Sequence, residues 1–132
     1  MEVKIIQGVK REVLEDIFVT ALEGGSNYWY FINEENHEKM RRAVPVEKEQ
    51  CFSTALFRAV YDEALDIDVH DVEDTEEKIG TLSVRSMFER LDNLMKDEDY
   101  RWALFAEIEE QGDAISSDVV FQYLTMGEVV YA

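Results

Sequence analysis

The chain has few of the residues that form disulfides, break secondary structure or balance acidic charge. Among its 132 residues there is one cysteine, Cys51, and one proline, Pro45, and 13 basic residues stand against 30 acidic ones. A single cysteine excludes an intramolecular disulfide, which fits a reducing compartment. With one proline and no glycine- or serine-rich linker, nothing marks a domain boundary, so residues 1–132 are expected to form a single domain.

Several functional segments and motifs are also missing. No apolar run approaches the length of a membrane span, and charged residues interrupt the N-terminal MEVKIIQGVKREVLEDI, so we expect neither a membrane anchor nor a signal peptide. The GxxxxGK, GxSxG, HExxH and paired CxxC motifs do not occur. Cys51 has no recognisable histidine partner and is interpreted as a small buried hydrophobe at a helix start. We therefore expect a cytoplasmic protein without a cofactor, and more a binding protein than an enzyme.

The excess of acidic residues gives a formal net charge of −17 at pH 7. Such a surface repels phosphate backbones and anionic membranes, which argues against direct binding to nucleic acid or to lipid. It favours a basic protein partner, and it also permits imitation of nucleic acid toward a nucleic-acid-binding protein. Plain solubility is the alternative explanation, because abundant carboxylates keep proteins soluble.

The acidic charge is concentrated in Asp62–Glu77, which has nine acidic residues and no lysine or arginine. Apolar and polar residues alternate over Leu65–Val69, and this pattern predicts a half-buried strand. Counted from Asp66, further carboxylates stand at the third, ninth and twelfth positions of a calcium-binding loop. The sixth position, where that loop needs glycine, is Asp71, so no metal site is predicted. The weak metal candidates are Asp66, Asp68, Asp74 and Glu77.

The most informative local pattern is Thr20–Phe31, which reads TALEGGSNYWYF. Apolar residues recur at three- and four-residue spacing over Val13–Leu22, and this predicts a helix that ends where Gly24 and Gly25 accept left-handed backbone. The aromatic run predicts a strand over Tyr28–Ile32. The segment is either a helix end followed by a core strand, or the wall of a ligand pocket. The candidate ligand-binding residues are Glu23, Asn27, Tyr28 and Trp29, with Glu128 from the C-terminal tail.

The rest of the chain is mostly helical in its periodicity. A serine N-cap at Ser83 and a glycine stop at Gly127 mark two of the helix boundaries. A further strand is expected at Val3–Ile6 or Val129–Tyr131. The expected helices span Glu34–Arg42, Cys51–Ala64, Val84–Met95, a segment after Asp97 or Asp99 that ends at Gly112, and Ala114–Met126. Together these patterns predict a mostly helical α+β domain with five or six helices around a small two- or three-stranded antiparallel sheet.

Two segments resemble the ends of a group of small uncharacterised proteins carried by bacteriophages and mobile genetic elements. The resemblance rests on EGG-x-x-YW within Thr20–Phe31 and on Q-x-x-x-x-GE-x-VY within Val119–Tyr131. That group has a glycine after the final tyrosine, where this chain has Ala132. The resemblance implies a phage or mobile-element origin and a cytoplasmic host setting, and it implies no catalytic residues.

Three functions remain open from the sequence. The first is a non-enzymatic accessory protein that binds a protein partner through its acidic surface, with nucleic-acid mimicry as one form of it. The second is a small-ligand binder or an enzyme with a pocket beside EGGSNYW. The third is an oligomerising module that uses aromatic surface not needed by the core.

Overall fold

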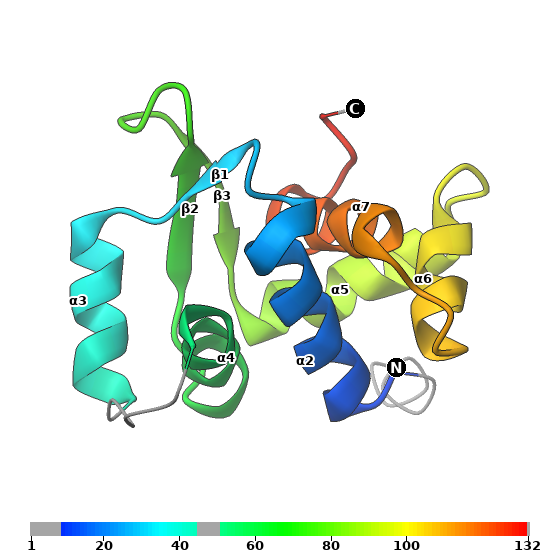
Figure 1. The fold of residues 1–132 in the computed structure, drawn as a ribbon, viewed down its shortest axis with the longest axis horizontal. Helices are drawn as coiled ribbons and strands as arrows, with labels where there is room; N and C mark the ends of the chain where they lie inside the picture. Colours follow the sequence, from blue (N-terminus) through cyan, green and yellow to red (C-terminus); the bar gives the residue numbers. More distant parts are fainter. Residues whose placement is uncertain (1–8, 45–50, 132) are drawn as a thin grey trace.

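Six α-helices and a three-stranded antiparallel sheet form the part of the chain that the computed structural model describes, residues 9–44 and 51–131 (Figure 1). This arrangement confirms the predicted mostly helical α+β fold. Within the described residues no helix is both long and apolar enough to span a membrane. The elements are α2 (Arg11–Thr20), β1 (Tyr30–Phe31), α3 (Glu34–Ala43), α4 (Phe52–Phe57), β2 (Ile67–Asp71), β3 (Lys78–Leu82), α5 (Val84–Met95), α6 (Arg101–Ile108) and α7 (Ala114–Met126).

Helix α7 is the centre of the helical part. It contacts α2, α5, α6 and β3, and ten consecutive residues, numbered 116–125, are buried. From α2, Phe18 packs edge-on against Phe121 of α7 at 5.4 Å and against Phe57 of α4 at 5.2 Å between ring centroids. These contacts hold α2, α4 and α7 in one core.

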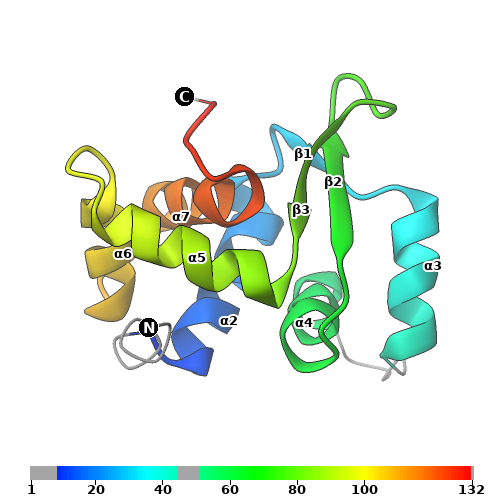
Figure 2. The ribbon, with the colours of Figure 1, turned by 180° about the vertical axis from the view of Figure 1, so that it is seen from behind.

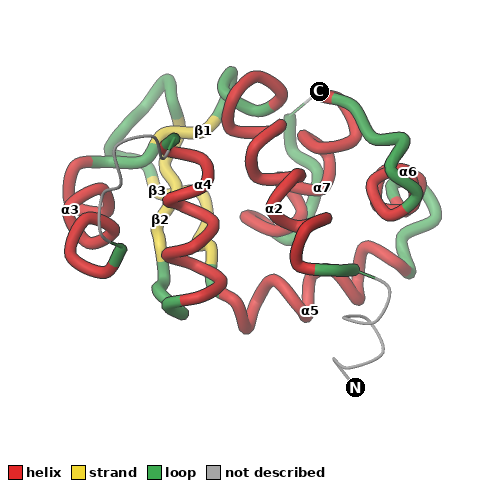
Figure 3. Tube along the Cα trace, turned by 60° about the horizontal axis from the view of Figure 1, so that its bottom comes forward, coloured by secondary structure: helices red, strands yellow, loops and turns green. Residues whose placement is uncertain are grey.

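The sheet lies beside this helical core, with α3 on its outer side (Figure 2). Its strand order is β1-β2-β3, with Phe31 opposite His70 and Val69 opposite Gly80. Asn36 fixes α3 to the sheet, because its buried side-chain oxygen accepts the backbone N–H of Asp68 at 3.0 Å. The tube view shows the same division, with α3 at one end of the molecule and α6 at the other (Figure 3).

Strand β3 has no counterpart among the strands predicted from the sequence, because Gly80 interrupts its short apolar pattern. The structure explains this glycine. A Cβ at Gly80 would lie 2.3 Å from the carbonyl oxygen of Thr125, so the strand can approach the end of α7 only without a side chain here. The Arg90 guanidinium lies at the same place and donates to the carbonyls of Leu124 and Thr125 at 2.8 and 2.6 Å. A cation at a helix C-terminus stabilises the helix dipole.

The predicted reason for the helix end at the double glycine is wrong. α2 continues into a π-helical turn, Ala21–Gly25, and among the described glycines only Gly127 has a positive φ, of 79°. A Cβ on Gly25 would lie 2.5 Å from the carbonyl oxygen of Ala114, whereas one on Gly24 would meet nothing within 4 Å. Gly25 is therefore needed for close packing against α7, and not for a left-handed backbone.

The aromatic strand is shorter than predicted. Only Tyr30 and Phe31 pair with β2, whereas Tyr28 and Trp29 form a turn in which the Trp29 N–H donates to the Ser26 carbonyl at 3.1 Å. The terminal segment Val129–Tyr131 forms no strand. The other expected terminal strand, at Val3–Ile6, lies outside the described residues.

Candidate functional site

The centre of the candidate site is a buried carboxylate that the sequence analysis did not identify. Asp118 of α7 is 9% exposed, and four side chains donate hydrogen bonds to it. Its Oδ1 accepts from Ser26 Oγ at 2.7 Å and from Trp29 Nε1 at 2.8 Å. Its Oδ2 accepts from the Tyr28 hydroxyl at 2.6 Å and from Gln122 Nε2 at 3.2 Å. We call these five residues the Asp118 network.

The π-helical turn positions one half of this network. The Ser26 N–H donates to the Ala21 carbonyl at 2.7 Å, which turns the chain so that residues 26–29 face α7. The missing side chain of Gly25 lets this turn approach the first residue of α7. The turn thereby brings its serine, tyrosine and tryptophan donors to one carboxylate on a helix far along the chain.

Gln122 connects the network to the C-terminal tail, residues 128–131. Its Oε1 accepts the backbone N–H groups of Val130 and Tyr131, each at 2.9 Å, and its Nε2 donates to the Tyr131 carbonyl at 3.1 Å. The Tyr131 ring stacks on Trp29, with 5.5 Å between centroids and 13° between planes. The backbone groups of Val130 and Tyr131 thus hydrogen-bond to the Gln122 side chain and not to a strand of the sheet.

The structure brings together some of the residues predicted for a ligand site. Trp29 is buried, and Tyr28 is 46% exposed with its hydroxyl directed to Asp118. Asn27, Glu23 and Glu128 are exposed.

Glu23 takes part in a different contact. Its Oε2 accepts from Ser53 Oγ of α4 at 2.6 Å, away from the Asp118 network. Because both Asp118 oxygens accept hydrogen bonds from the protein, the network acts as a structural clasp between the turn, α7 and the tail.

Asp118, Gln122 and Ser26 were not predicted from the sequence, although a signal existed for two of them. Asp118 and Gln122 stand four residues apart in a helix whose remaining residues after Ser117 are mainly apolar. Residues with this spacing share one side of a helix. A helix that is apolar all round is buried, and polar residues within it need partners.

A small cavity of about 260 Å³ lies between α7 and the tail. Asp118 forms part of its wall, and the other walls are apolar or aromatic. They come from Tyr100, Ile115, Val119, Val129, Val130 and Tyr131.

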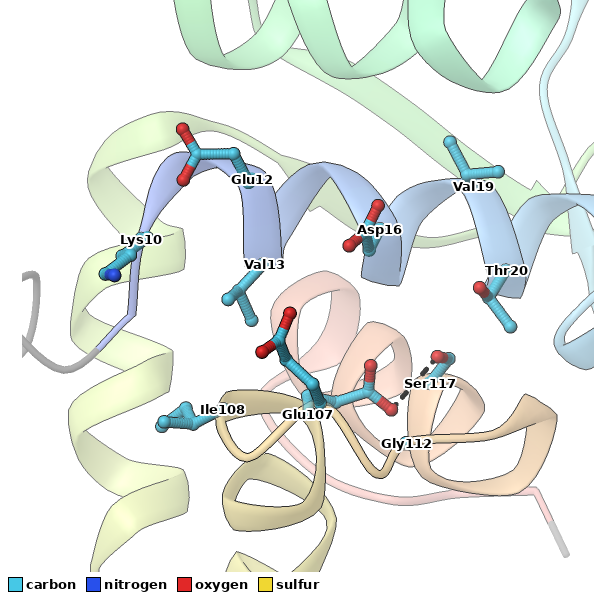
Figure 4. Close-up of a pocket in the computed structure, with 11 residues that line it drawn as sticks. Lys10, Glu12, Val13, Asp16, Val19, Thr20, Glu107, Ile108, Gly112 and Ser117 are labelled. Carbon is cyan, nitrogen blue, oxygen red and sulfur yellow. Dashed lines mark hydrogen bonds between the residues drawn. The ribbon is translucent and has the colours of Figure 1, made fainter.

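A larger cavity of about 530 Å³ lies between α2 and the segment that joins α6 to α7 (Figure 4). Glu107 points toward Ser117 there, and its Oε2 accepts from Ser117 Oγ at 3.2 Å and from the Ser116 hydroxyl. Lys10 is the one basic residue of the wall, and the acidic ones are Glu12, Asp16, Glu107 and Glu110. Such a wall favours a cationic group over a phosphate.

The weak metal candidates lie on the β2–β3 hairpin and in the segment just before it. Asp68 on β2 accepts from the Thr81 hydroxyl at 2.9 Å and lies 3.3 Å from Lys78 Nζ. Asp74 and Glu77 lie in the connection between β2 and β3, and Asp66 precedes β2. Within residues 9–44 and 51–131, no three histidine, cysteine, aspartate or glutamate side chains are grouped so that they could hold a metal ion.

Comparison with known proteins gives no relative for this chain: no family model, no curated protein and no solved structure matched it.

We expect the buried Tyr123 hydroxyl to make the free energy of unfolding fall at alkaline pH. Burial, and then its hydrogen bond of 2.7 Å to Asp97, raise the pKa of Tyr123 from 10.0 to about 12. A pKa that is raised in the folded state gives stability that is complete below pH 10 and is lost as the pH rises toward 12. We expect Tyr123→Phe to flatten this loss in urea unfolding measured across that range. Superimposable tyrosine absorbance titrations of the folded and the urea-unfolded protein would contradict the expectation.

Proposed function

We propose that this protein is a non-enzymatic accessory protein that binds a basic protein partner through the tip of the β2–β3 hairpin, residues 71–77. The observation that carries the proposal is the charge and position of this tip. Five of its seven residues are acidic and none is basic. The hairpin projects beyond the helices on the side of the molecule where the C-terminal tail ends (Figures 1 and 2). The acidic residues are Asp71, Glu73, Asp74, Glu76 and Glu77.

The backbone of the hairpin tip is held in one conformation. The Asp71 N–H donates to the Glu77 carbonyl at 3.0 Å, and the Asp74 N–H donates to the Asp71 carbonyl at 3.2 Å. The Asp71 carboxylate also accepts the backbone N–H of Glu73 at 2.8 Å. A preorganised loop loses less conformational entropy when it binds, which favours recognition of a partner by this loop.

The C-terminal tail adds aromatic and apolar surface beside the tip. Burial, and then the carboxylates of Asp71, Glu77 and Glu73, raise the pKa of the Tyr131 hydroxyl, so these acidic side chains lie near it. Val130 on the same tail is 54% exposed. Protein interfaces combine an aromatic or apolar centre with a polar rim, and this face offers both.

A nucleic-acid-binding protein is the basic partner that we favour. The basic surface with which such a partner binds the phosphate backbone of a nucleic acid also attracts closely spaced carboxylates. This chain carries a net charge of −17. If the resemblance to phage and mobile-element proteins holds, this partner is a cytoplasmic host protein. The Asp118 network supports a role without catalysis, because its carboxylate is fully engaged by the fold.

The proposal is tested with two variants of equal charge. Glu73→Gln, Asp74→Asn, Glu76→Gln and Glu77→Gln together remove four of the five acidic charges of the hairpin tip. The matched control neutralises four exposed acidic residues elsewhere, through Glu35→Gln, Glu63→Gln, Glu89→Gln and Glu98→Gln. Binding is measured by biolayer interferometry against a panel of purified bacterial DNA- and RNA-binding proteins, with duplex DNA as a competitor.

We expect a complex that DNA displaces and that weakens by about tenfold or more between low and high salt, because screening removes its electrostatic attraction. The tip variant should bind about tenfold more weakly than wild type, and the control variant less than about threefold more weakly. Equal losses in the two variants would show that net charge, and not the hairpin tip, drives binding. Absence of binding at low salt throughout the panel would contradict the proposed function itself.

A further inference from the structure

The outer side of α6 exposes aromatic residues that the core does not use. Ala103 and Leu104 face the core and are fully buried, whereas Trp102 is 47% exposed and Phe105 is 40% exposed. The helix is thus apolar on its inner side and on its outer side. Helices that are apolar all round are normally covered on both sides, so the outer side of α6 is a candidate contact surface.

Helical periodicity defines this surface. At 3.6 residues per turn, residues 101, 102, 105 and 109 lie within about 100° of one another around the helix axis, on the side away from the buried pair Ala103 and Leu104. Arg101 and Glu109 are exposed, as are the two aromatic residues between them. The helix lies at one end of the molecule, opposite α3 (Figures 1 and 3). We call Arg101, Trp102, Phe105 and Glu109 the α6 face.

The α6 face carries one basic and one acidic residue in a very acidic protein. Helix α6 itself contains a single acidic residue, Glu107, and the hydroxyls of Ser116 and Ser117 in α7 bind that carboxylate. The four residues of the α6 face carry no net charge, so the face itself adds no repulsion to that between two molecules of net charge −17.

We propose that the α6 face binds the α6 face of a second copy of this chain, with the two helices antiparallel around a two-fold axis at Phe105. Arg101 and Glu109 stand four residues before and after Phe105. An antiparallel pair centred on Phe105 therefore places Arg101 opposite the partner's Glu109, and the symmetry repeats this ion pair. The face is thus complementary to itself in charge and apolar at its centre, as a two-fold interface requires.

This self-association goes beyond the proposed function and responds to salt in the opposite direction. Screening weakens an acidic hairpin bound to a basic partner. For the homodimer, screening mainly reduces the repulsion between two like-charged molecules, and the apolar centre is insensitive to it. We expect the dimer to tighten by about threefold or more between roughly 50 and 500 mM salt. Failure of one idea leaves the other intact, because the residues, the partner and the direction of the salt effect differ.

The test is a charge exchange followed by sedimentation velocity at increasing protein concentration. The variant Arg101→Glu places two glutamates opposite each other across the interface, and Glu109→Arg places two arginines together. We expect each single variant to dimerise about tenfold more weakly than wild type. The double variant should recover the wild-type affinity, and an equimolar mixture of the two single variants should form a heterodimer. Recovery of this kind cannot come from a folding defect.

A second substitution tests the apolar centre. Phe105→Glu should abolish the dimer, because it places two carboxylates at the two-fold axis. Val130→Glu adds the same charge at an exposed residue outside the face and should leave the dimer in place. A wild-type protein that stays monomeric at about 1 mM in high salt overturns the proposal. A dimer that Phe105→Glu leaves unchanged, or that the double variant does not restore, overturns it too.

Discussion

Gly25→Ala is expected to lower the free energy of unfolding by about 2–3 kcal/mol or more. The added Cβ would lie 2.5 Å from the carbonyl oxygen of Ala114, and this contact is with backbone at the start of α7, which cannot rotate away. The π-helical turn would have to move off α7, and the donors of Ser26 and Trp29 would move with it. Urea unfolding followed by circular dichroism measures the loss.

The neighbouring glycine provides the matched control. A Cβ on Gly24 meets nothing within 4 Å, and its backbone has no positive φ, so alanine fits there without strain. We expect Gly24→Ala to leave stability unchanged or to raise it by up to about 1 kcal/mol, because alanine favours helical backbone and restricts the unfolded chain. Equal losses in the two variants would contradict the role given to Gly25.

Asp118→Ala is expected to lower the free energy of unfolding by about 3 kcal/mol or more, because it removes the acceptor of four hydrogen bonds. Ser26 and Trp29 are buried to 0% and 1% exposure, so their donors would be left without water. Asp118→Asn keeps one acceptor oxygen and should lose less than the alanine variant. The intrinsic fluorescence of Trp29 would report the local change as well as global unfolding.

Asp99 serves as the surface control for this substitution. It is exposed, and its backbone N–H, not its carboxylate, makes the contact with Asp97. Asp99→Ala should change stability by less than about 0.5 kcal/mol. A loss at Asp118 no larger than the loss at Asp99 would show that the four hydrogen bonds contribute nothing net to stability.

Much of the fold was predictable because local signals specify it. Ser83 caps α5 by accepting the Ser86 N–H at 3.2 Å, and Gly127 ends α7 in the left-handed conformation, as predicted. Both depend on residues within one turn of the helix end. Strand β3 was not predictable in this way, because its glycine is explained only by the approach of Thr125 at the end of α7, far later in the chain.

The candidate site was half predictable for the same reason. The sequence pointed to Tyr28 and Trp29 and to the C-terminal tail, since aromatic and glycine patterns are local. It did not show that Asp118 joins them, because the spacing of Asp118 and Gln122 in an apolar helix indicates buried polar residues but does not identify partners about 90 positions earlier in the chain. The prediction that the glycines end the helix through a left-handed backbone was wrong. Close packing against α7, and not a positive φ, requires glycine at position 25.

The Asp118 network also has a consequence for the speed of unfolding. Its bonds to Ser26, Tyr28 and Trp29 join residues 92, 90 and 89 positions apart. Contacts across such long loops lose much chain entropy when they form, so they tend to form after the local helices and the β2–β3 hairpin. An interaction that is absent from the folding transition state acts on the unfolding barrier. We therefore expect the Asp118 network to affect the unfolding rate more than the folding rate.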